Sequence, residues 1–121
     1  MQERRRYVRL NIPLEVSYTI QGKEGKEYKA ITKNISPNGA RFSIEEELPK
    51  GAILNIGIKI PTRPDFIPIK ARVVWSKKEV ELEQEKDIYD AGFEFIQISE
   101  EDKSIFFQYL CNLMYDQLKK I

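Results

Sequence analysis

Strict alternation of apolar and polar residues restricts the fold of this chain more than any other feature. It is clearest at residues 14–20 and 54–60, where every second side chain is apolar. Side chains of a strand point alternately to its two faces, so this period of two predicts strands with one buried face. Strands of this kind need a shared hydrophobic core, and the chain is expected to be mostly β-structure.

Segments that contain glycine or proline separate the alternating stretches and are typical of turns and loops. The stretches between them predict six strands, at residues 14–20, 28–35, 40–44, 54–60, 69–76 and 89–98. The connections with the clearest composition are a hairpin loop at residues 21–26, a turn at residues 36–39 and a charged, solvated hairpin tip at residues 77–87. Hairpin connections of this length favour antiparallel pairing of neighbouring strands.

A helix is predicted at the C-terminal end of the sequence. Ser99 followed by Asp102 resembles the capping box that begins many helices, with an acid in place of the usual Glu or Gln. Apolar residues then recur at helical spacing: Ile105, Phe106, Tyr109, Leu110, Leu113, Met114 and Leu118. This stripe is expected to pack on its own domain, over a sheet face or a barrel mouth, rather than to form a dimer face. Cys111 lies in the same region and is expected to be a buried, inert thiol.

Six antiparallel strands followed by one helix predict a small all-β domain, either a six-stranded antiparallel β-barrel or a strongly curled sheet, with one C-terminal α-helix. The expected division is a ligand-binding arm at residues 1–12, a barrel at residues 13–98 and a helix at residues 99–121 packed on the barrel. A length of 121 residues fits one such domain.

The composition excludes several classes of function. The sequence has no histidine, which removes Ser-His-Asp and Cys-His catalysis and the commonest metal ligand. Its single cysteine cannot form an internal disulfide. No apolar run comes near the roughly 20 residues that cross a bilayer, and no secretion signal is recognisable. We therefore expect a non-catalytic, cytoplasmic protein without a cofactor, a metal or a membrane-inserted segment.

The N-terminal arm is the first candidate for ligand binding. It contains Arg4, Arg5, Arg6 and Arg9, opposed only by Glu3. Arginine presents a planar fork of donors that matches phosphate oxygens or the O6 and N7 edge of guanine. A solubilising basic tail or a weak nucleic-acid-binding arm has the same composition. Since the net charge is only +1, an anion must be held by a local cluster rather than by bulk attraction.

The second candidate is the segment between two predicted strands at residues 34–39. Asn34 can both donate and accept hydrogen bonds, and Ser36 carries a hydroxyl. Gly39 permits a positive φ or the close approach of a ligand. The same residues also form ordinary turns in which Asn and Ser side chains bond to their own backbone. Either interpretation is open for this segment alone.

The two candidates together resemble the signature of the PilZ domain, a family of receptors for the second messenger cyclic di-GMP. Arg5 and Arg9 form an RxxxR motif, and Asn34, Ser36 and Gly39 follow at NxSxxG spacing after one predicted hairpin. Residues 71–75 and 91–95 also resemble the later strands of the family. The family's fold is a six-stranded barrel with a C-terminal helix, so the resemblance covers about the whole chain.

The resemblance implies a role for each motif residue. Arg5 and Arg9 are expected to grip phosphate and guanine, and Asn34 and Ser36 to contact a guanine edge, while Gly39 keeps the strand entrance open. Many members of the family have aspartate at the position of Asn34. An amide offers one accepting atom where a carboxylate offers two, so weaker binding is expected.

Other residues are candidates for additional contacts. Arg4 stands where the family holds a stacked pair of ligands, which implies one or two molecules of cyclic di-GMP per domain. Arg6 and Trp75 are candidate nucleotide contacts, and packing of Trp75 on the core or under the arm is slightly favoured over stacking on guanine. Three more basic residues either extend a positive rim or are solvated: Lys33, Arg41 and Arg72.

The expected function is therefore that of a non-catalytic receptor or adaptor in bacterial signal transduction. Binding would order the arm, change the surface of the domain and signal to an unidentified downstream protein. One alternative is a PilZ-like scaffold that has no nucleotide ligand and acts by protein–protein contact. Another is a small barrel that binds single-stranded RNA, but the near-neutral charge disfavours nucleic acid as a partner.

Overall fold

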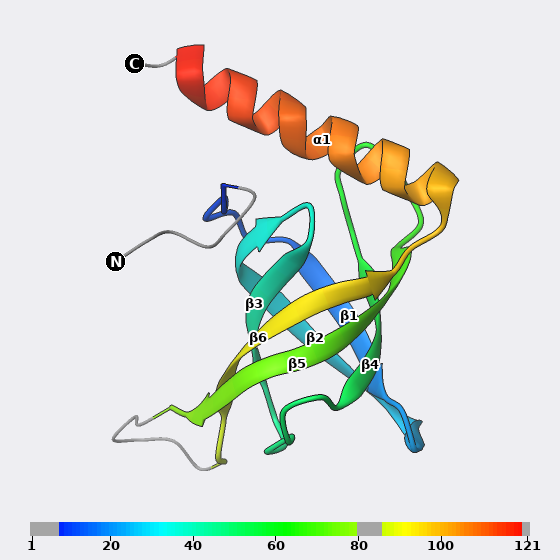
Figure 1. The fold of residues 1–121 in the computed structure, drawn as a ribbon, viewed down its shortest axis with the longest axis vertical. Coiled ribbons are helices and arrows are strands. Elements are labelled where there is room, and N and C mark those ends of the chain that lie inside the picture. Colours follow the sequence, from blue (N-terminus) through cyan, green and yellow to red (C-terminus); the bar gives the residue numbers. More distant parts are fainter. Residues whose placement is uncertain (1–7, 80–85, 120–121) are drawn as a thin grey trace.

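The computed structural model describes residues 8–79 and 86–119, which form six strands and one helix (Figure 1). The strands are β1 (Glu15–Ile20), β2 (Lys23–Ser36), β3 (Gly39–Ile44), β4 (Ile53–Ile58), β5 (Ile67–Lys78) and β6 (Tyr89–Gln97). The helix α1 spans Glu100–Lys119. The predicted order of six strands and a terminal helix is confirmed.

The six strands close into an antiparallel barrel in the order β1-β2-β3-β6-β5-β4, with β4 paired back to β1. The predicted fold class is therefore confirmed. Closure leaves no unpaired sheet edge, and it gives every strand an inner and an outer face. In this order β6 lies between β3 and β5, on the wall opposite β1. The outer face of β2, β3, β6 and β5 is the part of the barrel that matters for the site.

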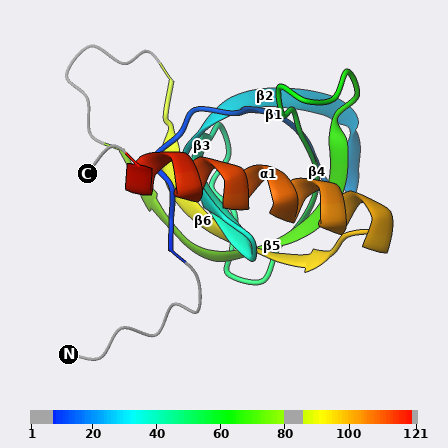
Figure 2. The ribbon, with the colours of Figure 1, turned by 90° about the horizontal axis from the view of Figure 1, so that it is seen from above.

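The barrel interior is filled by the apolar side chains that the alternation predicted. Phe42 and Phe93 stack at 4.3 Å between ring centroids, and Tyr18 and Phe42 are 5.8 Å apart. Helix α1 crosses one open end of the barrel, as seen from above in Figure 2. It buries Phe106 and Leu110, which confirms packing of the helix on its own domain.

The start of α1 has the predicted cap, but the apolar stripe does not bury its full length. The Asp102 backbone N–H donates to Ser99 Oγ at 3.2 Å, and Arg63 Nη1 lies 2.6 Å from Asp102 Oδ1. Leu118 is 67% exposed because the contact with the barrel ends before the last turns. The expectation that Cys111 is buried is wrong. It follows the buried Leu110 by about 100° around the helix, so its thiol is exposed.

Two predicted loops are shorter than expected. β2 begins at Lys23, so most of the predicted loop at residues 21–26 is strand, and Ile20 pairs with Lys23 across a two-residue turn. Gly22 supplies the positive φ of 92° that this turn uses. Lys23, Lys26 and Glu27 are exposed, so this part of β2 carries no apolar alternation. β5 likewise runs to Lys78, and residues 80–85 of the predicted charged tip lie outside the described part of the chain.

The registers of the described strands shift at four places, and two of these β-bulges change which side chains face outward near the site. The β2–β3 register shifts between Thr32 and Asn34, so Asn34 is half-buried on the outer face while Ile35 returns to the core. The β5–β6 register shifts between Val73 and Trp75 in the same way. A bulge adds one residue to one strand and thereby reverses the inside–outside order beyond it. Trp75 is 39% exposed as a result, so packing in the core is wrong for this residue, while packing under the arm and stacking on a ligand stay predictions.

Candidate functional site

The N-terminal arm is joined to the end of β2 by backbone pairing. The Leu10 N–H donates to the Ile35 carbonyl at 2.8 Å, and the Ile35 N–H donates back to the Leu10 carbonyl at 2.9 Å. Thr32 adds a second attachment, since its hydroxyl donates to the Ile12 carbonyl at 2.6 Å and accepts from the Leu14 N–H at 2.8 Å. The buried side chains of Leu10 and Ile35 join the core. The arm therefore follows the strand that carries the NxSxxG motif.

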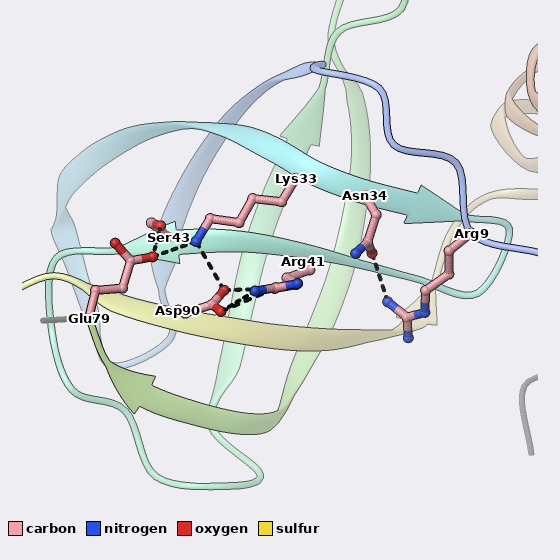
Figure 3. Close-up of polar contacts among 7 residues, drawn as sticks. All are labelled: Arg9, Lys33, Asn34, Arg41, Ser43, Glu79 and Asp90. Atoms are coloured by element: carbon pink, nitrogen blue, oxygen red, sulfur yellow. Dashed lines mark hydrogen bonds and ion pairs between the residues drawn. The ribbon is translucent and has the colours of Figure 1, made fainter.

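This docking brings one arginine of the arm onto the asparagine of the second motif. Arg9 Nη1 donates to Asn34 Oδ1 at 3.0 Å, although the two residues are 25 positions apart (Figure 3). The contact occupies the accepting atom of the amide, so the Asn34 nitrogen is the group that remains suited to a ligand acceptor. Arg4, Arg5 and Arg6 lie outside the described residues.

Ser36 and Gly39 lie at the turn between β2 and β3. Ser36 is buried, and its hydroxyl donates to Asn38 Oδ1 at 2.7 Å and lies 3.4 Å from the Gly39 carbonyl oxygen, which is the side-chain-to-backbone contact of the turn interpretation. Gly39 does not have a positive φ. A Cβ at this position would lie 2.4 Å from the Phe93 carbonyl oxygen, so glycine is required by the close approach of β3 to β6.

Four residues form a line across the outer face of the barrel, which we call the transverse row. The strand registers pair Asn34 with Arg41, Arg41 with Gly92, and Gly92 with Trp75, across β2, β3, β6 and β5. A Cβ on Gly92 would lie 2.2 Å from Trp75 Nε1, which means that the indole occupies the space above the glycine. The Arg41 guanidinium carbon is 5.8 Å from the centre of the Trp75 ring, within cation–π range.

A hollow of about 210 Å³ lies at the Trp75 end of the transverse row. Its lining residues come from the arm, the β2–β3 turn, β5 and β6: Arg9, Asn38, Val74, Trp75, Gly92, Phe93 and Glu94. The volume is below that of pockets which enclose a whole drug-sized ligand. An aromatic face, an arginine fork and an amide nevertheless suit a planar base attached to an anion. The arrangement can hold part of such a ligand at the surface.

A network of charges lies beside the hollow and is centred on Asp90, which is only 2% exposed. Arg41 Nε and Nη2 donate to the Asp90 carboxylate, with Nη2 at 2.6 Å from Oδ2, and Lys33 Nζ lies 3.3 Å from Oδ1 (Figure 3). Glu79 also accepts from Lys33, and from Ser43 at 2.7 Å. Lys33 and Arg41 are therefore ion-paired rather than freely solvated, and Glu79 is not part of a solvated tip.

The network makes a specific prediction about the effect of acid on stability. The hydrogen bond from Arg41, and then that from Lys33, hold the pKa of Asp90 below its ordinary value of 3.8. A depressed folded-state pKa gives stability that is present above the unfolded value and lost as the pH falls through the folded one. The difference in unfolding free energy between wild type and Asp90→Asn should therefore shrink as the pH falls below 3.8. Urea unfolding of both proteins at a series of pH values measures this, and an unchanged difference would contradict the pairing.

Two residues of this surface were missed from the sequence, and a third was left undecided. Gly92 lies in residues 91–95, which the sequence marked only by their resemblance to a later strand of the family. Asp90 belongs to no recognised motif. Arg41 was an undecided basic residue. The signal that relates Arg41, Gly92 and Trp75 is the register of three strands distant in sequence, which periodicity does not contain. The alternation of β3 and β6 alone indicated only that Arg41 faces outward.

No helix in the described part of the chain is long and apolar enough to span a membrane. Residues 8–79 and 86–119 contain no group of three or more His, Cys, Asp or Glu side chains placed to hold a metal ion.

Comparison with known proteins identifies one family. Residues 3–111 match the sequence model of the PilZ domain. No curated protein is similar enough in sequence to count as a match.

Solved structures of similar fold include the Bacillus subtilis inhibitor of motility MotI/DgrA, with a TM-score of 0.71 and 22% identity over 95% of this chain and 53% of that one. The K. pneumonia MrkH–c-di-GMP complex has a TM-score of 0.76 and 20% identity over 99% of this chain and 56% of that one. The PilZ domain of Escherichia coli YcgR with c-di-GMP has a TM-score of 0.65 and 15% identity over 98% and 100% of the two chains. This chain thus spans about half the length of MotI and MrkH.

Proposed function

Because this chain belongs to the PilZ domain family, we propose that it is a non-catalytic receptor for cyclic di-GMP. The ligand binds on the outer face of the barrel, between the N-terminal arm and the transverse row. The observation that carries the proposal is the hydrogen bond from Arg9 to Asn34, since it joins the RxxxR arm to the NxSxxG strand in one place. Two proteins of similar fold, MrkH and the YcgR domain, have been solved with this nucleotide.

The proposed roles follow the chemistry of each group. Arg5 and Arg9 hold phosphate and guanine through charge-assisted hydrogen bonds, which contribute about 1.5–3 kcal/mol each. Asn34 and Ser36 contact a guanine edge. Ser36 must exchange its bond with Asn38 to do so, or contact the ligand through an oxygen lone pair.

The remaining residues set the shape and stoichiometry of the proposed complex. Gly39 keeps β3 close to β6 at the mouth of the site. Trp75 stacks on a base, since its exposed indole lines the hollow that also contains Arg9. Arg4 sets whether one or two molecules bind, and Arg6 adds a further cationic contact.

Signalling follows from attachment of the arm to both the barrel and the ligand. In this mechanism the arm residues before Arg9 become fixed on the nucleotide, and the altered surface is what a downstream protein recognises. The pairing of Leu10 with Ile35 holds the base of the arm on β2, next to the Arg9–Asn34 contact.

Titration with cyclic di-GMP tests the proposal, and Trp75 provides a reporter because it is the only tryptophan in the sequence. Calorimetry should show binding at tens of micromolar or below, as about 6–8 kcal/mol is expected of such a ligand. Stacking of guanine on the indole should change the Trp75 fluorescence along the same curve. Trp75→Ala should weaken binding roughly fivefold to a hundredfold by calorimetry, because base–aromatic stacking contributes about 1–3 kcal/mol.

The controls separate this function from the alternatives. GMP at the same concentrations should bind much more weakly, since it offers one guanine in place of two. If the folded protein gives no heat of binding in the titration with cyclic di-GMP, the result would favour the alternative of a scaffold that acts by protein–protein contact. Binding of a generic single-stranded oligonucleotide with steep salt dependence would favour the RNA-binding interpretation.

A further inference from the structure

Arg41 occupies the centre of the transverse row. Its Cα pairs with Asn34 on one side and with Gly92 on the other, so it stands between the Arg9–Asn34 contact and Trp75. Figure 3 shows Arg41 and Asn34 on neighbouring strands of the same face of the barrel. A ligand that fills the hollow between Arg9 and Trp75 and extends along the transverse row reaches the Arg41 guanidinium.

The orientation of Arg41 is set by Asp90 before any ligand arrives. Asp90 accepts from Nε at 3.0 Å and from Nη2 at 2.6 Å, and this bidentate contact fixes the plane of the guanidinium. Within the described part of the chain, Nη1 of Arg41 makes no hydrogen bond, and the Arg41 side chain is 39% exposed. Nη1 is thus an oriented donor at the surface. Binding to it requires little further loss of side-chain freedom.

The space around Arg41 is shaped for a planar group. Gly92 has no side chain to separate Arg41 from Trp75, and the indole fills the space where a Cβ would stand. The Arg41 guanidinium carbon lies over the Trp75 ring, 5.8 Å from its centre, so a base that stacks on this face of the indole has its edge next to the guanidinium. Arginine pairs with the O6 and N7 acceptors of guanine, whereas the corresponding edge of adenine carries an amino donor that it would repel.

We propose that Arg41 is a further ligand-binding residue of this site, which donates from Nη1 to the O6/N7 edge of the guanine stacked on Trp75. Asp90 is the positioning residue that holds Arg41 in this orientation. The inference depends on the proposed function, because it names the group that reads the base of cyclic di-GMP. It goes beyond the two motifs, since neither Arg41 nor Asp90 belongs to RxxxR or NxSxxG.

The competing interpretation is that Arg41 serves only as the counter-ion of a buried carboxylate. Lys33 already lies 3.3 Å from Asp90, so Asp90 is not without another cation when Arg41 is removed. A purely ionic role would also be met by lysine, which carries the same charge without the planar fork. Arg41→Lys therefore distinguishes the two interpretations.

The test measures the dissociation constant of cyclic di-GMP by calorimetry, and the thermal midpoint of each protein without ligand. Arg41→Ala should weaken binding about tenfold or more, and Arg41→Lys should weaken it nearly as much. The matched control is Arg63→Ala, which removes an arginine that pairs with Asp102 at the same 2.6 Å but lies on the loop before β5. The control should keep the wild-type dissociation constant within about twofold.

A double-mutant cycle tests the positioning role of Asp90. Asp90→Asn should weaken binding in the wild-type background, but in the Arg41→Ala background it should change the dissociation constant by less than about twofold. If the double variant lost affinity by the product of the two single losses, Asp90 would act independently of Arg41. That result would overturn the positioning role of Asp90.

The other outcomes are equally decisive. An Arg41→Ala or Arg41→Lys protein that binds like wild type would overturn the contact, and so would an equal loss in Arg63→Ala, which would trace the effect to stability. A wild-type protein that binds no cyclic di-GMP would remove the proposed function together with this inference. If the wild type binds cyclic di-GMP and the Arg41 variants have the same dissociation constant, only this inference is overturned and the proposed function remains.

Discussion

Replacement of Arg9 by alanine is expected to weaken cyclic di-GMP binding roughly tenfold to a hundredfold while the barrel stays folded. Arg9 is the described arginine of the arm that contacts the second motif, through its 3.0 Å hydrogen bond to Asn34. The substitution removes the Arg9 guanidinium, which is a charge-assisted donor to the ligand. It also removes the hydrogen bond that holds the Asn34 side chain. Calorimetric titration of the variant against wild type measures the loss.

The stability of Arg9→Ala separates a lost contact from a lost fold. The Arg9 side chain is only half-buried, and the arm is attached to β2 by the Leu10–Ile35 backbone pairing, which the substitution leaves in place. The urea midpoint should therefore stay close to that of wild type. A variant that binds with wild-type affinity would show that the Arg9–Asn34 contact is only a local attachment of the arm.

Gly39→Ala is expected to lower the unfolding free energy by about 2–3 kcal/mol, within the range of overpacking substitutions. The added Cβ would stand 2.4 Å from the Phe93 carbonyl oxygen. That oxygen belongs to the backbone of β6, so it cannot rotate away as a side chain can. Relief of the clash requires β3 and β6 to separate where Gly39 pairs with Glu94.

Urea unfolding of Gly39→Ala and Gly25→Ala measures the unfolding free energy of two variants that carry the same change, glycine to alanine, at different positions. Gly25 also lies in a strand, but a Cβ there meets nothing within 4 Å, and its φ is not positive. Its change in stability should stay within about 0.5 kcal/mol. Equal stability of the two variants would refute the close approach of β3 to β6 and return Gly39 to a role in ligand contact alone.

The local pattern of the sequence predicted the elements of the fold with small errors at their ends. Period-two alternation marks a strand with one buried face wherever it occurs, and the stripe from Ile105 to Met114 marks a helix. The largest error is at the start of β2, where polar residues continue the strand. Lys23, Lys26 and Glu27 are exposed there, and exposed polar side chains give no apolar signal.

The two motifs could also be recognised in the sequence, but the contact between them in the folded protein could not be predicted from it. Arg9 and Asn34 are brought together because Leu10 pairs with Ile35. This pairing joins backbone groups, so other apolar residues at these two positions could also make it. The spacing of the motifs contains no information about that pairing. The family resemblance supplied the expectation of a joint site, and the described geometry gives the physical contact for Arg9.

The sequence by itself determined the six strands, the terminal helix and the residue types of an anion site, because these depend on local periodicity and side-chain chemistry. Only the tertiary structure decided which side chains share the outer face. Two bulges turn Asn34 and Trp75 outward against the alternation, and the strand registers set Arg41 and Gly92 between them. A bulge forms in response to the partner strand, so the position it exposes is fixed by long-range pairing that no local pattern records.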